Sequence, residues 1–249
     1  MTGILITTLA RRPELADRLW DMQNPWPAFA AHDPVSALLY PWMVAELPEY
    51  VFIATDGEEM VARAFSVPFA LHAADRAGAL PARGWDQVLM WAFADRRAGT
   101  EPDTVSAIEI TVAPHRQGEG LAGRMLAAMR EDARAHGFAE VVAPVRPNGK
   151  PAEPDTPMGE YAFRVREDGL PYDPWLRVHV RAGAVIDSVA PLSMTISASL
   201  ARWREWTGLP FDAPGPVRVP GALVPVHCAP DHDHAVYVEP NVWVRHPLV

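Results

Sequence analysis

Gly118 and Gly120 stand where a strand-like pattern gives way to a helical one. Apolar residues dominate the stretch from Val105 to Val112, and an amphipathic pattern follows from Leu121 to His136. Glycine allows a backbone to approach an anion closely, and the N–H groups in the first turn of a helix are free to bind one. The segment therefore predicts a cradle for a ligand that carries a pyrophosphate.

Two common phosphate-binding motifs do not fit this segment. A dinucleotide-binding fold places its glycine turn soon after a first strand, with an acidic residue about 20 positions later. Here the turn lies in the middle of the chain. A P-loop needs a Lys followed by Ser or Thr, and the turn contains no such pair. The order of residues thus favours a different phosphate-bearing ligand.

The sequence Val-Ala-Pro-His-Arg-Gln-Gly-Glu-Gly-Leu-Ala-Gly, residues 112–123, resembles motif A of the GCN5-related N-acetyltransferases, the GNAT superfamily. In that family the turn holds the pyrophosphate of acetyl-CoA. The resemblance is strong over residues 105–148 and weaker over residues 173–186. The rest of the chain is assigned by the order of its elements.

The resemblance implies two groups of residues that contact coenzyme A. Main-chain groups of Ile110 and Val112 would face the pantetheine arm, because in this family a bulge separates their strand from the next one. Six residues would surround the pyrophosphate: Arg116, Gln117, Gly118, Gly120, Ala122 and Gly123. The expected co-substrate is acetyl-CoA, and no metal is expected.

Glu109 is the candidate base. Amide formation from a thioester and an amine needs a group that takes the ammonium proton and donors for the thioester oxygen. Strand alternation places Ile108, Ile110 and Val112 on one face and Glu109 on the other. GNAT enzymes often use a Glu on this strand as the base, directly or through a water. The alternative for Glu109 is a purely structural carboxylate.

His179 is the candidate acid that gives a proton to the departing thiolate. Many GNAT members carry a Tyr four residues before a Gly-Phe pair. Here the pair is replaced by Gly183-Ala184, and His179 lies four residues earlier. A His can donate a proton near neutral pH. This departure from the family leaves Tyr161 and Tyr172 as alternatives.

Two other chemistries have weaker support. The only cysteine, Cys228, lies far from the motif and is expected to be a small buried residue rather than a nucleophile. The run Asp231-His232-Asp233-His234 holds metal-binding residue types, but consecutive residues in a turn seldom converge on one ion. A zinc hydrolase that uses His232 and His234 is the rival interpretation.

The elements that position these residues follow from the spacing of apolar residues. Strands are expected at residues 3–9, 50–55, 60–69, 105–112, 139–145, 185–196, 223–229 and 235–244. Helices are expected at residues 12–22, 34–46, 84–97, 121–136, 174–181 and 200–206. Asp33 and Asp173 precede prolines and are expected to cap two of these helices.

The expected fold is a single α+β domain over residues 1–249, with three layers in which helices flank a mixed, mostly antiparallel, twisted sheet. Six prolines punctuate residues 147–174, which are expected to form an inserted loop with one helical turn near Met158 to Phe163. A loop of this length is a candidate lid or recognition element. Residues 200–249 are expected to be a C-terminal extension.

Composition narrows the function classes. The 249 residues are 49% hydrophobic and carry a formal net charge of −9, which disfavours nucleic-acid binding. There is no apolar run of about 18 residues, so no membrane span is expected. The N-terminus has no basic segment before its apolar run, and a single cysteine fits a reducing compartment, so a cytoplasmic location is expected.

Because the whole chain is acidic, local cations must gather at the cradle, where Arg116 and Arg124 are candidates. Lys150 is a weaker candidate and is expected to be an exposed surface cation. The sequence therefore predicts an N-acetyltransferase that moves an acyl group, in the simplest case acetyl, from acyl-CoA to a primary amine of a small molecule or peptide. The expected route is direct attack in a ternary complex. The alternative is a non-catalytic acyl-CoA-binding sensor or scaffold, and a homodimer is left open.

Overall fold

The computed structural model describes residues 3–248, which contain one nine-stranded sheet. Met1, Thr2 and Val249 lie outside that range. The expected cytoplasmic location rests in part on the N-terminal segment, whose first two residues are therefore not described. The strands are β1 (Leu5–Thr8), β2 (Val51–Asp56), β3 (Glu59–Phe69), β4 (Thr104–Val112), β5 (Glu140–Val145), β6 (Val185–Ala198), β7 (Gly215–Val217), β8 (Val226–Ala229) and β9 (His234–Pro247). Their spatial order is β1-β2-β3-β4-β5-β9-β8-β7, and β6 pairs with β9.

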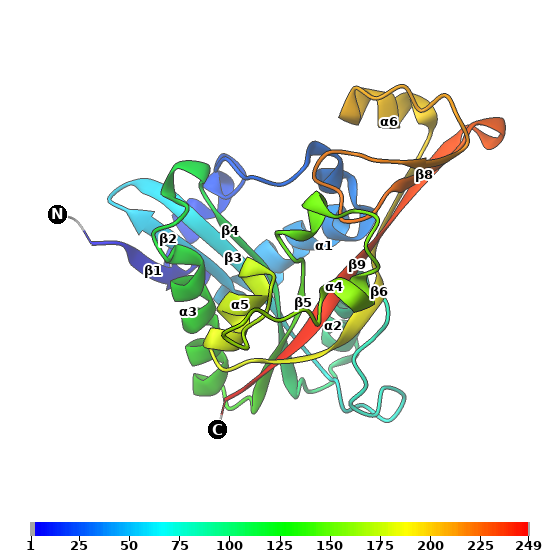
Figure 1. Ribbon diagram of the computed structural model, residues 1–249. Coiled ribbons are helices and arrows are strands. Elements are labelled where there is room, and N and C mark those ends of the chain that lie inside the picture. Colours follow the sequence, from blue (N-terminus) through cyan, green and yellow to red (C-terminus); the bar gives the residue numbers. More distant parts are fainter. Residues whose placement is uncertain (1–2, 249) are drawn as a thin grey trace.

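Helices cover both faces of the sheet. They are α1 (Pro34–Glu46), α2 (Gly84–Ala98), α3 (Leu121–Ala135), α4 (Met158–Tyr161), α5 (Pro174–Arg181) and α6 (Leu200–Thr207). Figure 1 shows α3 and α5 on one face, with α1 and α2 behind the other. Every strand pair in the described residues is antiparallel except β4 with β5. The predicted α+β fold with a mixed, mostly antiparallel sheet is confirmed.

Both predicted helix caps are present. The Asp33 carboxylate accepts a hydrogen bond from the Ser36 N–H at 2.6 Å, and α1 begins at Pro34 as expected. The Asp173 carboxylate accepts from the Trp175 and Leu176 N–H groups at 2.8 and 3.0 Å. Each cap satisfies N–H groups that a helix start leaves without partners. The caps therefore fix where α1 and α5 begin.

The helix predicted over residues 12–22 is wrong. The segment forms short 3-10 turns, at Leu9–Arg11 and Pro13–Arg18, and the turns continue with Leu19 N–H bonded to Ala16 C=O at 3.3 Å. Such turns, in which hydrogen bonds join residues i and i+3, are common in short connecting segments. Leu15, Leu19 and Met22, the predicted apolar face, are nevertheless buried. The apolar spacing therefore predicted which residues are buried but not the helix type.

The segment 147–174 is largely irregular, as predicted, with a 3-10 turn at Lys150–Ala152 and the single turn α4. The Asp173 carboxylate holds its two ends together, because it also accepts from the Gly149 N–H at 2.8 Å and the Tyr161 hydroxyl at 3.0 Å. Lys150 is fully buried, and its ammonium donates to the carbonyl oxygens of Glu153 and Leu223. The expectation that Lys150 is an exposed cation is therefore wrong.

β9 lies inside the sheet rather than at its end. Its C-terminal half pairs with β5 on one side, and β6 runs along its other side. Trp243 and Val244 of β9 are almost fully buried. The last part of residues 200–249 thus supplies a central strand of the fold.

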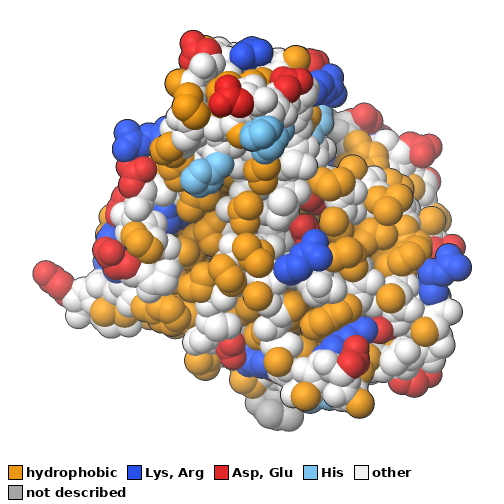
Figure 2. Space-filling model, turned by 90° about the vertical axis from the view of Figure 1, so that its right-hand side faces the viewer, with side chains coloured by type: hydrophobic (Ala, Val, Ile, Leu, Met, Phe, Trp, Pro, Cys, Tyr) orange, Lys and Arg blue, Asp and Glu red, His pale blue; other side chains and the backbone are white. Residues whose placement is uncertain are grey.

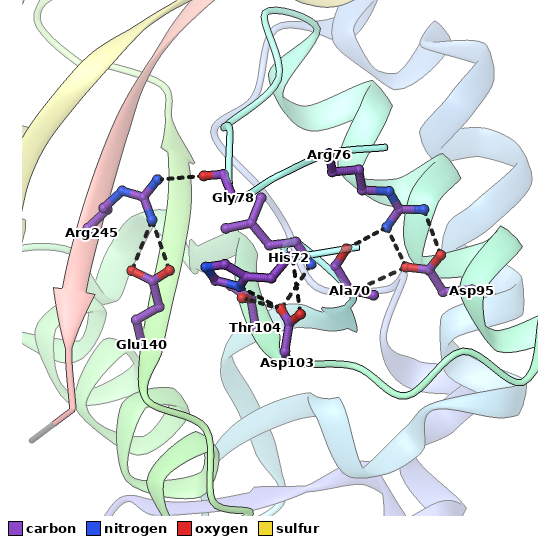
Figure 3. A network of polar contacts seen from close by, with 10 residues as sticks. Ala70, His72, Arg76, Gly78, Asp95, Asp103, Thr104, Glu140 and Arg245 are labelled. Atoms are coloured by element: carbon purple, nitrogen blue, oxygen red, sulfur yellow. Dashed lines mark hydrogen bonds and ion pairs between the residues drawn. The ribbon is translucent and has the colours of Figure 1, made fainter. Parts of the chain in front are cut away.

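The loop between β3 and α2 is tied to the sheet by charged side chains (Figure 3). Arg76 donates two hydrogen bonds of 2.6 Å to the Asp95 carboxylate in α2, and the same carboxylate accepts from the Ala70 N–H. At the other end, Arg245 of β9 bridges Glu140 of β5 and the Gly78 carbonyl. These contacts hold α2 in place against the sheet. Among residues 3–248, no helix is both long and apolar enough to cross a bilayer.

Candidate active site

A cavity of about 780 Å³ opens where β4 and β5 separate. The two strands pair only at Val105 with Val141 and at Ser106 with Val142. Beyond these pairs, residues 107–112 of β4 form one wall, and residues 143–145 of β5 with the following Arg146 form the other. The rest of the lining comes from residues 116–118 and the start of α3, from α5, from residues 25–27, and from Trp85, Asn148, Pro151 and Gly221. The separation of two parallel strands thus creates room for a ligand between them.

A bulge in β4 contributes to this separation. Phe65 of β3 pairs with Glu109, but the next residue, Ser66, pairs with Ala107, so Ile108 is the extra residue. A bulge bends its strand and increases the local twist. Ile110 and Val112, the predicted pantetheine contacts, follow the bulge and line the cavity on the side where β5 has moved away. Both residues therefore lie at the cavity, and their contact with pantetheine stays a prediction.

The predicted cradle forms the end of the cavity at α3. Gly118 and Gly120 have φ angles of 84° and 76°, a region that side chains disfavour, and a Cβ added to either would meet no heavy atom within 4 Å. Gly120 is the N-cap of α3, no side chain caps the helix, and its first turn holds no acidic residue. The N–H groups of that turn are left for an anion. Arg116, Gln117, Gly118, Gly120, Ala122 and Gly123 all line the cavity.

Arg116 is held at the cradle by two acidic side chains. Its guanidinium contacts the Asp56 carboxylate at 3.1 Å and the Glu119 carboxylate at 2.9 Å. The hydrogen bond with Glu119, and to a smaller extent the one with Asp56, raises the pKa of Arg116 above its ordinary value. The pairing reduces the net positive charge that Arg116 offers to a phosphate. The guanidinium of Arg116 is thus partly neutralised by its two carboxylate partners.

Glu109 is buried, and it is one of the residues that line the cavity. It accepts hydrogen bonds from the Arg63 guanidinium at 3.1 Å, the Tyr40 hydroxyl at 3.0 Å and the Thr111 hydroxyl at 2.7 Å. Thr111 in turn accepts from Trp26 Nε1 at 3.0 Å. The carboxylate is thus held by three donors, in a residue that lines the cavity.

The sequence did not reveal the partners of Glu109. Arg63 and Tyr40 come from β3 and α1, which are remote in the chain. Thr111 could have been inferred, because it lies two residues after Glu109 and so shares its face of the strand. Trp26 lies between Pro25 and Pro27, where no periodic pattern predicts which way its side chain points.

His179 also lines the cavity, although only 2% of the residue is exposed. Its Nδ1 lies 2.9 Å from Nε2 of His246, and the Trp175 ring packs edge-on at 4.6 Å. Burial, followed by the neighbouring His246, lowers the pKa of His179 to about 3. The imidazole is therefore neutral at physiological pH. Tyr161 and Tyr172, the alternative acids, do not line this cavity, and the Tyr161 hydroxyl donates to Asp173.

Three buried carboxylates, those of Asp33, Asp86 and Glu239, lie within electrostatic reach of one another. Glu239 is held by Arg146 at 3.0 Å, and Arg146 itself lines the cavity. Asp86, the residue after Trp85, is 1% exposed, and burial followed by the charge of Asp33 raises its pKa to about 8. Oδ1 of Asp33 and Oδ1 of Asp86 have no hydrogen-bond partner among residues 3–248. This part of the molecule therefore holds more acidic groups than cations.

The run of residues 231–234 does not build a metal centre within the part of the chain that the structure describes. The imidazoles of His232 and His234 lie 6.0 Å apart, and both residues are exposed. The projecting lobe with α6 and the β8–β9 turn lies at the top of Figures 1 and 2, and histidine and acidic side chains gather on it there. These side chains lie away from the cavity lining.

Comparison with known proteins identifies the family. Over 279 aligned positions the chain is 33% identical to arginine N-acetyltransferase avaD of Aspergillus versicolor, and the match covers 99% of this chain and 94% of that protein. The chain belongs to the GCN5-related N-acetyltransferases. This GNAT protein is an acyl-CoA-dependent N-acetyltransferase, as the sequence predicted. No family model matches it.

Two solved structures share the fold of this GNAT chain. The loading GNATL domain of CurA from Lyngbya majuscula superposes with a TM-score of 0.60 at 18% identity, over 99% of this chain and 97% of that one. The GphF GNAT-like decarboxylase in complex with isobutyryl-CoA superposes with a TM-score of 0.54 at 17% identity, over 99% of this chain and 100% of that one. At these identities the similarity establishes the architecture.

Proposed function

We propose that this protein transfers an acetyl group from acetyl-CoA to a primary amine of a small cationic molecule, with arginine as the first candidate acceptor. The observation that carries the proposal is that Glu109 and the first turn of α3 line one cavity. A single cavity can hold the thioester and the amine together, which supports direct attack in a ternary complex. The name of the relative from Aspergillus versicolor supports arginine as the acceptor and acetyl as the group transferred.

In this proposal, acetyl-CoA supplies the activated thioester and the chain supplies its position. The N–H groups at the start of α3 bind the pyrophosphate, and Gly118 and Gly120 let the backbone come close to it. Main-chain groups of Ile110 and Val112 hold the pantetheine arm along β4. The arm then lies between the two separated strands.

Glu109 takes the proton of the acceptor amine, directly or through a water. A carboxylate offers about four acceptor sites, and hydrogen bonds from Arg63, Tyr40 and Thr111 occupy three of them. About one site is left for the amine, and the three donors fix where it points. Holding the base in one orientation favours proton transfer in the reactive geometry.

The buried carboxylates favour an acceptor that carries a positive charge. Trp85 lines the cavity, and Asp86 follows it directly in α2. The pKa of Asp33 is raised by burial and, to a smaller extent, by Glu239, so these groups lie within electrostatic reach of one another. Arg146 compensates only Glu239 directly. A bound cation would stabilise the ionised forms of the other two carboxylates, and a guanidinium or ammonium group is therefore the preferred acceptor chemistry.

The test incubates the protein with acetyl-CoA and a panel of amines that contains arginine, agmatine, lysine and neutral amines of similar size. Thiol release and the mass of the product are measured. We expect acetylation of cationic amines, with a neutral isostere turned over at least about tenfold more slowly, since one lost charge contact is worth about 1.4 kcal/mol or more. Equal rates for neutral and cationic amines would contradict the acceptor assignment.

Two variants separate chemistry from binding. Glu109→Gln should lose turnover but keep the affinity for CoA, measured by calorimetry, whereas Gly120→Glu should lose the affinity. Gly208→Glu is the matched control for the second variant, because Gly208 also has a positive φ, of 69°, and open space around a Cβ. Glu58→Gln, at an exposed position, is the control for the first. Full turnover by Glu109→Gln would remove Glu109 from the base role.

A further inference from the structure

The environment of His246 assigns it a part in the reaction that the sequence did not indicate. His246 lies on β9, is fully buried, and pairs across the sheet with Val141 of β5. Its Nε2 lies 2.9 Å from Nδ1 of His179. Since His179 lines the cavity and its Nδ1 is engaged by His246, Nε2 is the ring nitrogen that His179 can present to a ligand.

The hydrogen bond between the two imidazoles has two mutually exclusive forms. Both rings are neutral, because burial lowers the pKa of His179 to about 3 and that of His246 to about 4. A neutral imidazole carries one N–H and one lone pair. If His246 donates, the N–H of His179 is on Nε2 and faces the cavity. If His179 donates, its Nε2 shows the cavity a lone pair instead.

The charge of Arg130 on α3 favours one of the two forms. The guanidinium of Arg130 donates a hydrogen bond to the Ala182 carbonyl at 2.7 Å. Burial is the larger cause of the lowered pKa of His246, and the positive charge of Arg130 lowers it further. Nδ1 of His246 and Nε of Arg130 are both buried without a hydrogen-bond partner among residues 3–248. A nearby cation favours a lone pair over an N–H at Nδ1. The proton of His246 is then on Nε2 and is directed at His179.

We propose that His246 is a positioning residue that donates its Nε2–H to Nδ1 of His179 and so fixes the tautomer in which His179 presents an Nε2–H donor to the cavity. A neutral imidazole donor stabilises charge that develops on the thioester oxygen or sulfur without giving up its proton, as a fixed donor in other acyl-transfer sites does. His179 is then a hydrogen-bond donor rather than a proton donor. The inference deepens the proposed function, since it rests on transfer taking place in this cavity.

The tautomer is measured directly by ¹⁵N NMR of the histidine rings in the protein without substrate at pH 7. We expect the proton of His179 on Nε2 in the wild type. The variant Arg130→Met should remove the cation, raise the pKa of His246 and mix the two tautomers. A proton found on Nδ1 of His179 in the wild type would overturn the proposal. Because this readout needs no turnover, it stays decisive even if no amine is acetylated and the proposed function fails.

The kinetic consequence is tested with two substitutions of the same residue. His246→Phe removes the donor and should lower kcat by roughly 10- to 100-fold, the range found when the partner of a functional imidazole is removed, with KM for acetyl-CoA unchanged. His246→Gln keeps an N–H donor and should recover most of kcat. Binding of CoA and the near-ultraviolet circular dichroism of both variants report whether they are folded. Wild-type kcat in a folded His246→Phe variant, or equal losses in both folded variants, would contradict the proposal.

Discussion

At the scale of single residues, the site combines groups that are held firmly with groups that lack partners. Glu109 accepts three hydrogen bonds, whereas Oδ1 of Asp86 and Nδ1 of His246 have no hydrogen-bond partner among residues 3–248. Burial without a partner disfavours the charged form of a group, so these side chains couple the stability of the fold to pH.

Acid should destabilise the fold through the histidine pair. In the unfolded chain both rings have a pKa near the ordinary value of about 6.5, whereas in the fold His179 titrates at about 3 and His246 at about 4. Below pH 6.5 the unfolded state therefore binds protons that the folded state does not. The free energy of unfolding should fall between pH 6.5 and 4, by up to about 1.4 kcal/mol per pH unit for each ring.

Denaturant unfolding at a series of pH values measures this slope. His246→Gln should reduce it, while His227→Gln, at an exposed position, should leave it unchanged. A stability that is flat from pH 6.5 to 4.5 in the wild type would show that the two rings are not buried in the neutral form.

Asp86 gives the opposite dependence at higher pH. Its pKa is about 8 in the fold and near 3.8 in the unfolded chain, so between these values the folded state binds the extra proton. The contribution of Asp86 to stability should therefore decline as pH rises from about 4 to 8, by at most about 1.4 kcal/mol per pH unit. Below pH 6.5 it offsets part of the larger histidine effect, and above pH 6.5 it dominates. Asp86→Asn keeps an acceptor for the Thr195 N–H and should be more stable than the wild type at pH 8.

Thermal melts at pH 5 and pH 8 test this, with a larger gain expected at pH 8 than at pH 5. If Asp86 also helps to hold a cationic acceptor, the same variant should raise KM for arginine. A variant less stable than the wild type at pH 8 would indicate that Asp86 is ionised and paired in the fold.

At the scale of elements, the site depends on where helices and strands begin. The start of α3 supplies the cradle, and the cap of α5 fixes the helix that carries His179. The position of α5 depends most on its N-cap residue, Asp173. Its carboxylate caps α5 and also accepts from Gly149 and Tyr161, which anchors the segment 147–174 beside the cavity.

Asp173→Ala should therefore cost more than an ordinary cap. Loss of an N-cap costs about 1 kcal/mol, and the two further buried hydrogen bonds raise the expected loss to roughly 2–4 kcal/mol. Ser199→Ala is the comparison, because Ser199 caps α6 through one hydrogen bond of 3.4 Å. Chemical denaturation measures both losses. Equal losses in the two variants would mean that Asp173 acts as a cap alone.

At the scale of the whole molecule, β9 connects the two halves of the sheet. It lies between β5, which forms one wall of the cavity, and β6, which packs against α2. Trp243 on this strand is 1% exposed and donates to the Pro81 carbonyl at 2.9 Å. It thereby joins the sheet to the loop before α2, which Arg245 on the same strand also holds, at Gly78 (Figure 3).

Trp243→Ala should cost about 3–5 kcal/mol of unfolding free energy, since it leaves a large cavity at the centre of the sheet. Val185→Ala, at a 63% exposed position on β6, should change stability by no more than about 0.5 kcal/mol. Saturating acetyl-CoA should recover part of the loss, because a ligand that binds only the folded state stabilises it. A loss below about 1 kcal/mol for Trp243→Ala would mean that the strand is not central to the fold.

Local features of this protein could be read from neighbouring residues. The glycines at positions 118 and 120, the cap before Pro34 and the apolar face of α3 each depend on residues within one or two turns of the chain. Backbone sterics and helix periodicity act at that range, so the cradle and the family resemblance followed from the sequence. The helix expected at residues 12–22 failed because apolar spacing alone does not distinguish an α-helix from successive 3-10 turns.

The environment of each candidate side chain was decided only by the tertiary structure. Tyr40 lies 69 positions from Glu109, Arg63 lies 46 positions from it, and His246 lies 67 positions from His179. Such pairs form because whole elements pack together, and no local pattern encodes which side chains then meet. The sequence thus predicted the class of ligand, a pyrophosphate-bearing cofactor, and the segments that carry the candidate site residues. The packing of α1, β3 and β9 around β4 and α5 determined which groups are charged, which are neutral, and which direction each one faces.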